Sequence, residues 1–126
     1  MLYGSPHTTL ACGDWKGNIY LYELTFGAEC RYQLKRTILN AHNGYITALK
    51  NCPINKNGEV LFASGSYDGY IKIWSTKDLN PIYEEEVSNR KVMDLQWDSG
   101  AKFILVLVDD QNDGCILVSL YSSTKI

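Results

Sequence analysis

The chain has 126 residues, enough for one domain that buries roughly two-thirds of the surface exposed by its unfolded form. Its 12 Lys and Arg residues are outnumbered by 14 Asp and Glu residues, which gives a net charge of −2 and a pI of about 5.6. This balance lacks the positive excess of proteins that follow a phosphate backbone. The longest apolar run, residues 103–108, is too short to cross a bilayer. We therefore expect a cytoplasmic or nuclear protein without a membrane span.

The cysteines and histidines give no pattern for a metal or redox site. The four cysteines lie far apart in the sequence and form no Cys-x-x-Cys pair. The two histidines, His7 and His42, do not have the spacing of metal ligands. We therefore expect reduced, buried cysteines, no metal and no cofactor.

Apolar residues alternate with a period of two over short stretches, which Gly, Asn and Asp residues separate. This alternation predicts β-strands joined by tight turns, and no stretch has the sustained period of a helix. In chain order, the predicted strands cover residues 9–13, 18–24, 31–38, 45–51, 60–66, 70–75, 82–87, 91–97, 102–108 and 115–121. The sequence therefore predicts an all-β fold.

One unit of two strands and a turn occurs more than once. Residues 10–22 align with residues 62–74 without a gap, and a weaker third copy begins at residue 104. In each copy a strand leads into a turn that ends in glycine, where a positive φ costs little. The turn glycines Gly17, Gly69 and Gly114 are 52 and 45 residues apart, which is close to the period of four-stranded propeller blades.

Residues 39–75 resemble a repeat of the WD-repeat β-propeller family. They contain a loop histidine, an Ala-Ser-Gly-Ser strand, an Asp-Gly turn and a strand that ends in tryptophan. In that family a histidine, a serine or threonine, an aspartate and a tryptophan form a hydrogen-bonded tetrad that locks the blade. By matching position, the resemblance implies a structural tetrad of His42, Ser64, Asp68 and Trp74.

The other two copies depart from the tetrad pattern. In the first copy, Cys12, Lys16 and Tyr22 occupy the serine, aspartate and tryptophan positions. In the third copy, Asp113 matches the aspartate, whereas Ser119 falls at the tryptophan position. These copies are assigned to the family by adjacency and strand pattern.

The repeats predict a partial β-propeller built of four-stranded antiparallel WD-repeat blades. The predicted blades span residues 1–38, 39–87 and 88–126, and the last one lacks its outermost strand. Propellers usually close with four to eight blades. We therefore expect the chain, with about three blades, to be the C-terminal portion of a longer propeller or a half that a second chain completes.

Several loop residues are candidates for partner binding, because function in such scaffolds resides in the loops. The resemblance implies that they face the narrow end of the propeller, where partners dock. Large aromatic side chains on rigid turns favour burial in a partner, although these rings could also simply cover neighbouring loops. The candidates are Trp15, Tyr45, Thr47, Tyr67, Lys91 and Met93.

Two functions follow, and catalysis is not among them. His42, Ser64 and Asp68 have the residue types of a catalytic triad, but Ser64 falls within a predicted strand and not on an exposed turn. The first function is a non-enzymatic scaffold or adaptor that binds other proteins of a multisubunit assembly. The alternative is a propeller subunit of an RNA-processing or RNA-modifying complex, with RNA retained through Lys35 and Arg36. The acidic pI favours the first.

Overall fold

The computed structural model describes residues 7–54, 60–78, 80–110 and 114–119. These residues form ten β-strands in three antiparallel sheets, and none of them lies in a helix. The all-β prediction is therefore confirmed. It also follows that this part of the chain holds no helix with the length and apolar character needed to cross a membrane.

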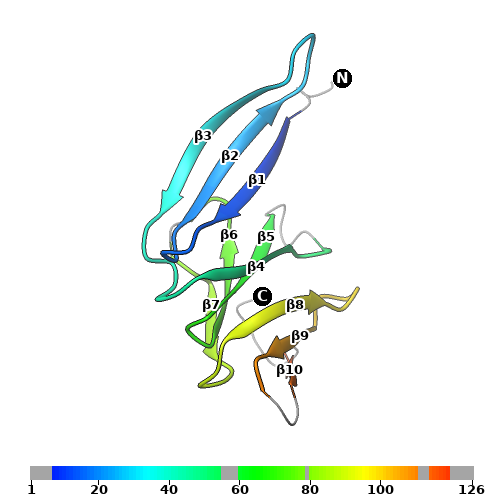
Figure 1. Ribbon diagram of the computed structural model, residues 1–126. Helices are drawn as coiled ribbons and strands as arrows, with labels where there is room; N and C mark the ends of the chain where they lie inside the picture. Colours follow the sequence, from blue (N-terminus) through cyan, green and yellow to red (C-terminus); the bar gives the residue numbers. More distant parts are fainter. Residues whose placement is uncertain (1–6, 55–59, 79, 111–113, 120–126) are drawn as a thin grey trace.

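Each sheet consists of strands that are consecutive in the chain (Figure 1). The first sheet contains β1 (His7–Gly13), β2 (Ile19–Thr25) and β3 (Arg31–Ile38). The second contains β4 (Ile46–Asn51), β5 (Leu61–Ser66), β6 (Tyr70–Ser75) and β7 (Tyr83–Glu86). The third contains β8 (Val92–Trp97), β9 (Phe103–Val108) and β10 (Cys115–Ser119). These strands correspond to the ten predicted ones, with bounds that agree within two residues.

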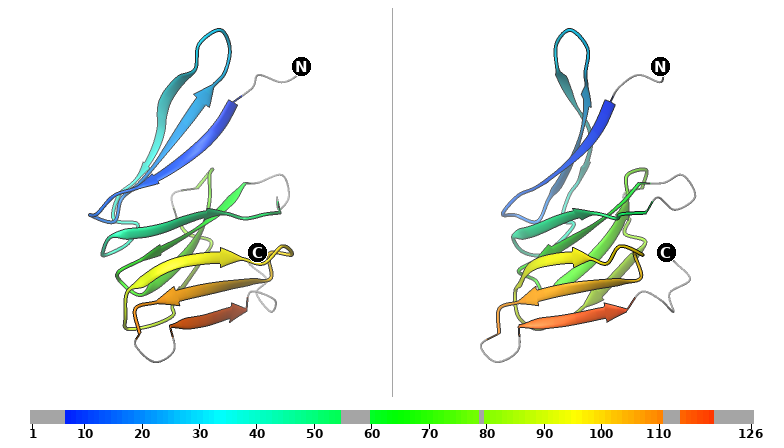
Figure 2. Two further views of the ribbon diagram at one scale, coloured as in Figure 1. Left: turned by 45° about the vertical axis from the view of Figure 1, so that its right-hand side comes forward. Right: turned by 90° about the vertical axis from the view of Figure 1, so that its right-hand side faces the viewer.

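The three sheets follow one another along the molecule. Strand β4 contacts β1 of the first sheet on one side and β8 of the third sheet on the other, and Figure 2 shows β4 and β8 side by side in both of its views. The β2–β3 hairpin extends beyond the rest of the molecule (Figures 1 and 2). The second sheet is therefore the central one, and both of its faces have a neighbour.

Two apolar clusters hold the sheets together, one at each junction. Between the first and second sheets, Ile19 and Leu21 are buried with Phe62 and Trp74. Between the second and third sheets, the cluster contains Ala63, Ile71, Ile73, Val92, Leu95 and Val106. Because every second residue of a strand faces the same side, the alternating sequence supplies an apolar face to each junction.

The loops at one end of the sheets are held close by two turn glycines. Gly17 and Gly69 have φ values of +89° and +84°, in the left-handed region that favours glycine. A Cβ atom at Gly17 would lie 2.1 Å from the carbonyl oxygen of His42, and one at Gly69 would lie 2.1 Å from that of Ser88. The repeated glycine thus lets the following connection of the chain pass directly over each turn.

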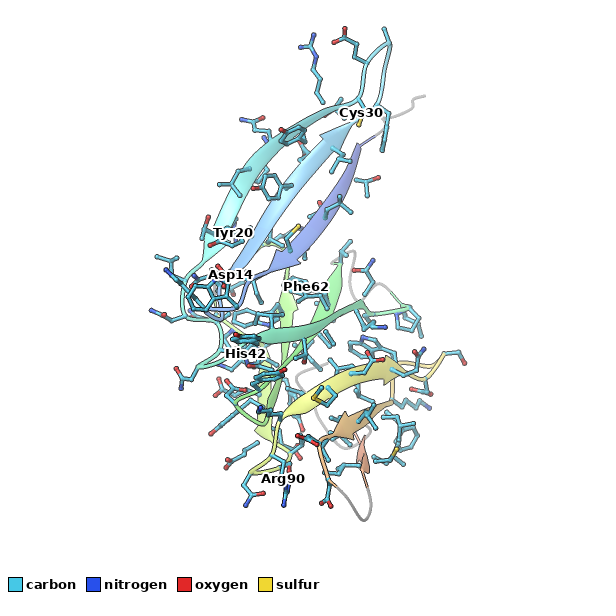
Figure 3. The ribbon with its side chains drawn as sticks, viewed as in Figure 1. Asp14, Tyr20, Cys30, His42, Phe62 and Arg90 are labelled. Atoms are coloured by element: carbon cyan, nitrogen blue, oxygen red, sulfur yellow. The ribbon has the colours of Figure 1, made fainter. Side chains whose placement is uncertain are left out.

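The expectation that the cysteines are buried is wrong for three of the four. Only Cys52 is buried, whereas Cys12, Cys30 and Cys115 are exposed. Cys30 precedes β3 at the end of the projecting hairpin, far from the other labelled side chains in Figure 3. Cys12 and Cys115 alternate with residues that face a junction and so point to the outside of the first and third sheets.

The third sheet also corrects the alignment of the third repeat copy. In the second sheet Trp74 lies opposite Phe62, and in the third sheet Val118 lies opposite Ile104. Counted from the start of the innermost strand, Val118 therefore holds the place of Trp74, and Ser119 comes one residue after it. The loop before β10 is longer than its counterparts, which hides this shift in the sequence. Asp113 lies outside the described residues.

Candidate functional site

The second sheet contains a chain of buried side-chain hydrogen bonds. The indole N–H of Trp74 donates to Ser64 Oγ at 2.8 Å, and Ser64 Oγ lies 2.6 Å from His42 Nε2. On the other side of the imidazole, His42 Nδ1 lies 3.0 Å from Asp68 Oδ2. The structure thus brings together the four residues that the resemblance grouped as a tetrad.

The ionisation of Asp68 fixes the direction of these hydrogen bonds. Burial alone would raise the pKa of Asp68, but hydrogen bonds from His42 and from the backbone N–H groups of Asn43 and Tyr70 outweigh it and lower the pKa to about 2. The carboxylate therefore accepts from Nδ1–H, and in the neutral imidazole Nε2 then accepts from the hydroxyl of Ser64. Ser64 is completely buried, which leaves no access for a substrate.

Asp68 also holds two loops in place. One of its oxygens accepts the backbone N–H of Asn43 at 2.9 Å, in the connection before β4, and the other accepts that of Tyr70 at 2.9 Å, at the start of β6. The same carboxylate therefore fixes the loop that leads to Tyr45 and the turn that carries Tyr67. These hydrogen bonds connect the tetrad to the surface above it.

The first sheet uses a different network at the corresponding end. Asp14 accepts the backbone N–H groups of Lys16 and Asn18, each at 2.9 Å, and the hydroxyl of Tyr20 at 2.7 Å. These bonds, that from the Asn18 backbone above all, lower the pKa of Asp14 to about 2. Figure 3 shows Asp14 and Tyr20 together at this end of the sheet. This network was not predicted from the sequence, although its signal there is an aspartate four residues before an asparagine in a turn.

Three aromatic side chains from different loops contact one another on the surface. Trp15 comes from the β1–β2 turn, Tyr45 precedes β4, and Tyr67 comes from the β5–β6 turn. The Trp15 and Tyr45 rings meet edge to face, with centroids 6.4 Å apart, and the Tyr45 and Tyr67 rings are stacked with centroids 4.8 Å apart. We call these three residues the aromatic row. Trp15 is 63% exposed and Tyr45 is 48% exposed.

A lysine lies over each end of the aromatic row. The ammonium nitrogen of Lys16 lies 5.2 Å from the centroid of the Trp15 ring, and that of Lys91 lies 4.5 Å from the centroid of the Tyr67 ring. Attraction between an ammonium group and the face of an aromatic ring explains both positions. Met93, two residues after Lys91, is 40% exposed. Five of the six partner-binding candidates are therefore exposed or partly exposed and lie in loops or at strand ends. They are Trp15, Tyr45, Tyr67, Lys91 and Met93.

Thr47 has a different position from the other candidates. It is half-buried between the second and third sheets, and its hydroxyl lies 2.7 Å from the carbonyl oxygen of Val92 and 3.2 Å from that of Gly65. A hydroxyl has a single proton to donate, and the shorter contact joins β4 to β8. The Thr47 hydroxyl therefore already serves the junction between two sheets.

The described residues contain no cluster of His, Cys, Asp and Glu side chains that could hold a metal ion. The aromatic row, its two lysines and the tetrad beneath it are thus the most organised set of functional side chains at this end of the sheets. This arrangement presents aromatic rings and ammonium groups at the surface.

Comparison with protein families assigns the middle of the chain. The family model described as "WD domain, G-beta repeat" matches residues 32–75. Residues 32–75 of this chain therefore form a WD repeat. The matched WD repeat contains all four tetrad residues and two residues of the aromatic row, Tyr45 and Tyr67.

The relatives carry names from ribosome assembly. The ribosome biogenesis protein YTM1 of Saccharomyces cerevisiae is 31% identical over 96 residues, which cover 70% of this chain and 20% of the relative. YTM1 of Vanderwaltozyma polyspora is 29% identical over 103 residues, covering 75% and 22%. The ribosome biogenesis protein WDR12 homolog of Nematostella vectensis is 32% identical over 80 residues, covering 63% and 18%. The chain therefore spans about a fifth of the length of these relatives.

Proposed function

We propose that this chain is part of a WD-repeat scaffold in a ribosome-biogenesis complex, and that it binds another protein of that complex through the aromatic row. The observation that carries this proposal is the contact between Trp15, Tyr45 and Tyr67, which come from separate loops and form one exposed surface. Exposed aromatic side chains that are held rigidly are typical anchors of protein interfaces. The names of the relatives support the part of this proposal that places the scaffold in ribosome biogenesis.

The rigidity of the surface supports a binding role. Asp68 orders the loops that carry Tyr45 and Tyr67, and Asp14 orders the turn that carries Trp15. A partner that binds rings held in this way does not have to immobilise them, which lowers the entropic cost of association. The proposed role is therefore that of a preorganised docking surface.

The proposed scaffold is non-enzymatic and acts in the nucleus, where ribosome assembly begins. The triad-like residues His42, Ser64 and Asp68 are used inside the second sheet, and Ser64 is buried. A hydroxyl enclosed in this way cannot attack a substrate. These observations support a role in binding and give no support to hydrolysis.

The test is affinity purification of the full-length protein from cells, with bound proteins identified by mass spectrometry. Trp15→Ala, Tyr45→Ala and Tyr67→Ala should each remove the same bound proteins. Phe26→Ala is the matched control, because Phe26 is an aromatic residue that is 45% exposed and lies at the β2–β3 hairpin. Loss of the same proteins from the Phe26→Ala sample, or from none of the samples, would reject the aromatic row as the docking surface.

A second candidate function is RNA binding through the basic residues of β3. The relatives named for ribosome biogenesis favour it, since ribosomes contain RNA. Against it, Lys35 Nζ lies 3.6 Å from a carboxylate oxygen of Glu23, so part of this charge is already balanced within the first sheet. If RNA is bound here, a Lys35→Glu, Arg36→Glu variant should lose salt-sensitive RNA retention while it keeps the proteins that depend on the aromatic row.

A further inference from the structure

The aromatic row and its lysines present hydrogen-bond donors and few acceptors. The ammonium groups of Lys16 and Lys91 carry three N–H donors each, and the indole of Trp15 carries one. None of the ion pairs within the described ranges involves Lys16 or Lys91. At this surface, therefore, donors remain available for a partner.

The carboxylates nearest the row are already used. Asp14 accepts four hydrogen bonds, including those from the backbone of Lys16 and from Tyr20. Asp68 accepts from His42, Asn43 and Tyr70. Both carboxylates accept these hydrogen bonds from within the protein, so they stabilise the loops and offer little to a ligand above the row.

Several of the ring faces are also covered, which favours one of two classes of anionic partner. Tyr45 and Tyr67 cover one face of each other, with an angle of 4° between their planes, and Lys91 lies over Tyr67. The Trp15 and Tyr45 rings meet edge to face, and the ammonium group of Lys16 lies over the Trp15 ring. Single-stranded RNA is held largely by bases stacked on open aromatic faces. The row offers few open ring faces to bases, whereas its ring edges and donors suit carboxylates and apolar side chains.

We propose that the aromatic row, between Lys16 and Lys91, binds an acidic protein segment whose carboxylates meet the two ammonium groups and whose apolar side chains cover the rings. This inference rests on the proposed function, because it names the chemistry of the partner at the same surface. Charge complementarity of this kind sets specificity and the rate of association.

The charges at the far end of the surface give the segment an orientation. Asp109 is exposed, and its backbone N–H donates to the Lys91 carbonyl oxygen at 2.8 Å. Carboxylates of a partner would be repelled there. The acidic part of the segment therefore lies between Lys16 and Lys91, over the three rings, and its continuation past Asp109 is neutral or basic.

The test measures fluorescence anisotropy of three labelled probes with the full-length protein at 50 and 300 mM salt. The probes are a ten-residue peptide of alternating Glu and Leu, the same peptide with Gln in place of each Glu, and a uridine decanucleotide. The Glu peptide should bind at least about tenfold more tightly than the Gln peptide at low salt, and more tightly than the RNA. Equal binding of the two peptides, no binding of the Glu peptide, or tighter binding of the RNA would each overturn the inference.

Charge reversal locates the site. A Lys16→Glu, Lys91→Glu variant should weaken binding of the Glu peptide at least about tenfold. Lys77→Glu, a change at an exposed lysine beyond β6 at the opposite end of the strands, should leave it unchanged. An equal effect of both changes would overturn the inference. If the cellular partners are lost with Tyr67→Ala but retained with the Lys16→Glu, Lys91→Glu variant, the proposed function stands and the acidic chemistry is rejected.

Discussion

Ser64 Oγ accepts the indole N–H of Trp74 at 2.8 Å inside the second sheet, with both side chains almost completely buried. The same oxygen lies 2.6 Å from His42 Nε2, within hydrogen-bond distance. A single hydroxyl thus satisfies two buried polar groups that belong to different parts of the repeat. The stability of the second sheet should therefore depend strongly on this one oxygen.

Ser64→Ala should lower the free energy of unfolding by about 2 to 6 kcal/mol, because it leaves two buried groups without a partner and each costs about 1 to 3 kcal/mol. Ser75→Ala is the matched control. Ser75 is also buried, but its hydroxyl accepts only one backbone N–H, from Lys77, and the expected loss is about 1 kcal/mol. Urea denaturation of the full-length protein measures both, and equal losses would contradict the central place of Ser64.

Acid should destabilise the protein through Asp68. The pKa of Asp68 is about 2 in the folded chain and 3.8 for a free side chain. Its contribution, about 2 kcal/mol, is therefore complete at neutral pH and is lost as the pH falls from about 4 through 2. Asp68→Asn should be less stable at pH 7 and should show a shallower loss of stability between pH 4 and pH 2. Parallel pH profiles for the two proteins would contradict this assignment.

Thr47→Val should show whether Thr47 binds a partner or only joins β4 to β8. The substitution keeps the shape of the side chain and removes the hydroxyl that reaches the Val92 carbonyl oxygen. The free energy of unfolding should fall by about 1 kcal/mol, while the bound proteins that depend on Tyr45 and Tyr67 should be retained. Loss of those proteins from a variant of unchanged stability would instead make Thr47 a docking residue.

The isolated chain of 126 residues should associate in solution. The outer face of the third sheet exposes Leu105, Leu107 and Leu117, which are 45%, 45% and 63% exposed, and the first sheet exposes Leu10 on its outer face. Contiguous exposed apolar side chains favour association. Size-exclusion chromatography with light scattering should give a mass above the 14.3 kDa of one chain. A Leu107→Lys, Leu117→Lys variant should lower that mass, and a wild-type monomer would contradict the prediction.

Local sequence rules were sufficient for the strands and turns. Alternation of apolar residues located all ten strands, and the glycines at residues 17 and 69 marked turns that need a positive φ. Both features depend only on neighbours in the chain. The third repeat copy was harder, because a longer loop hides a shift of one residue, and only the pairing of Val118 with Ile104 reveals it.

The contacts between sheets could not be obtained from local patterns. Trp15 and Tyr45 are thirty residues apart in the sequence, and their contact depends on how the first sheet meets the second. The exposure of Cys12 and the use of Thr47 between β4 and β8 depend on the same stacking. The sequence therefore predicted candidate loop residues for partner binding, and the structure shows which of these side chains contact one another. Their role in binding stays a prediction.

Site-specific photo-crosslinking tests the central claim most directly. The full-length protein is produced in cells with the photoreactive amino acid p-benzoylphenylalanine at position 45, at position 67 or, as a control, at position 77. Positions 45 and 67 belong to the aromatic row, whereas Lys77 is exposed beyond β6 at the opposite end of the strands. We predict that irradiation links positions 45 and 67 to the same protein of a ribosome-assembly complex and does not link position 77 to it. Crosslinks to that protein from position 77 alone, or from all three positions equally, would contradict the account.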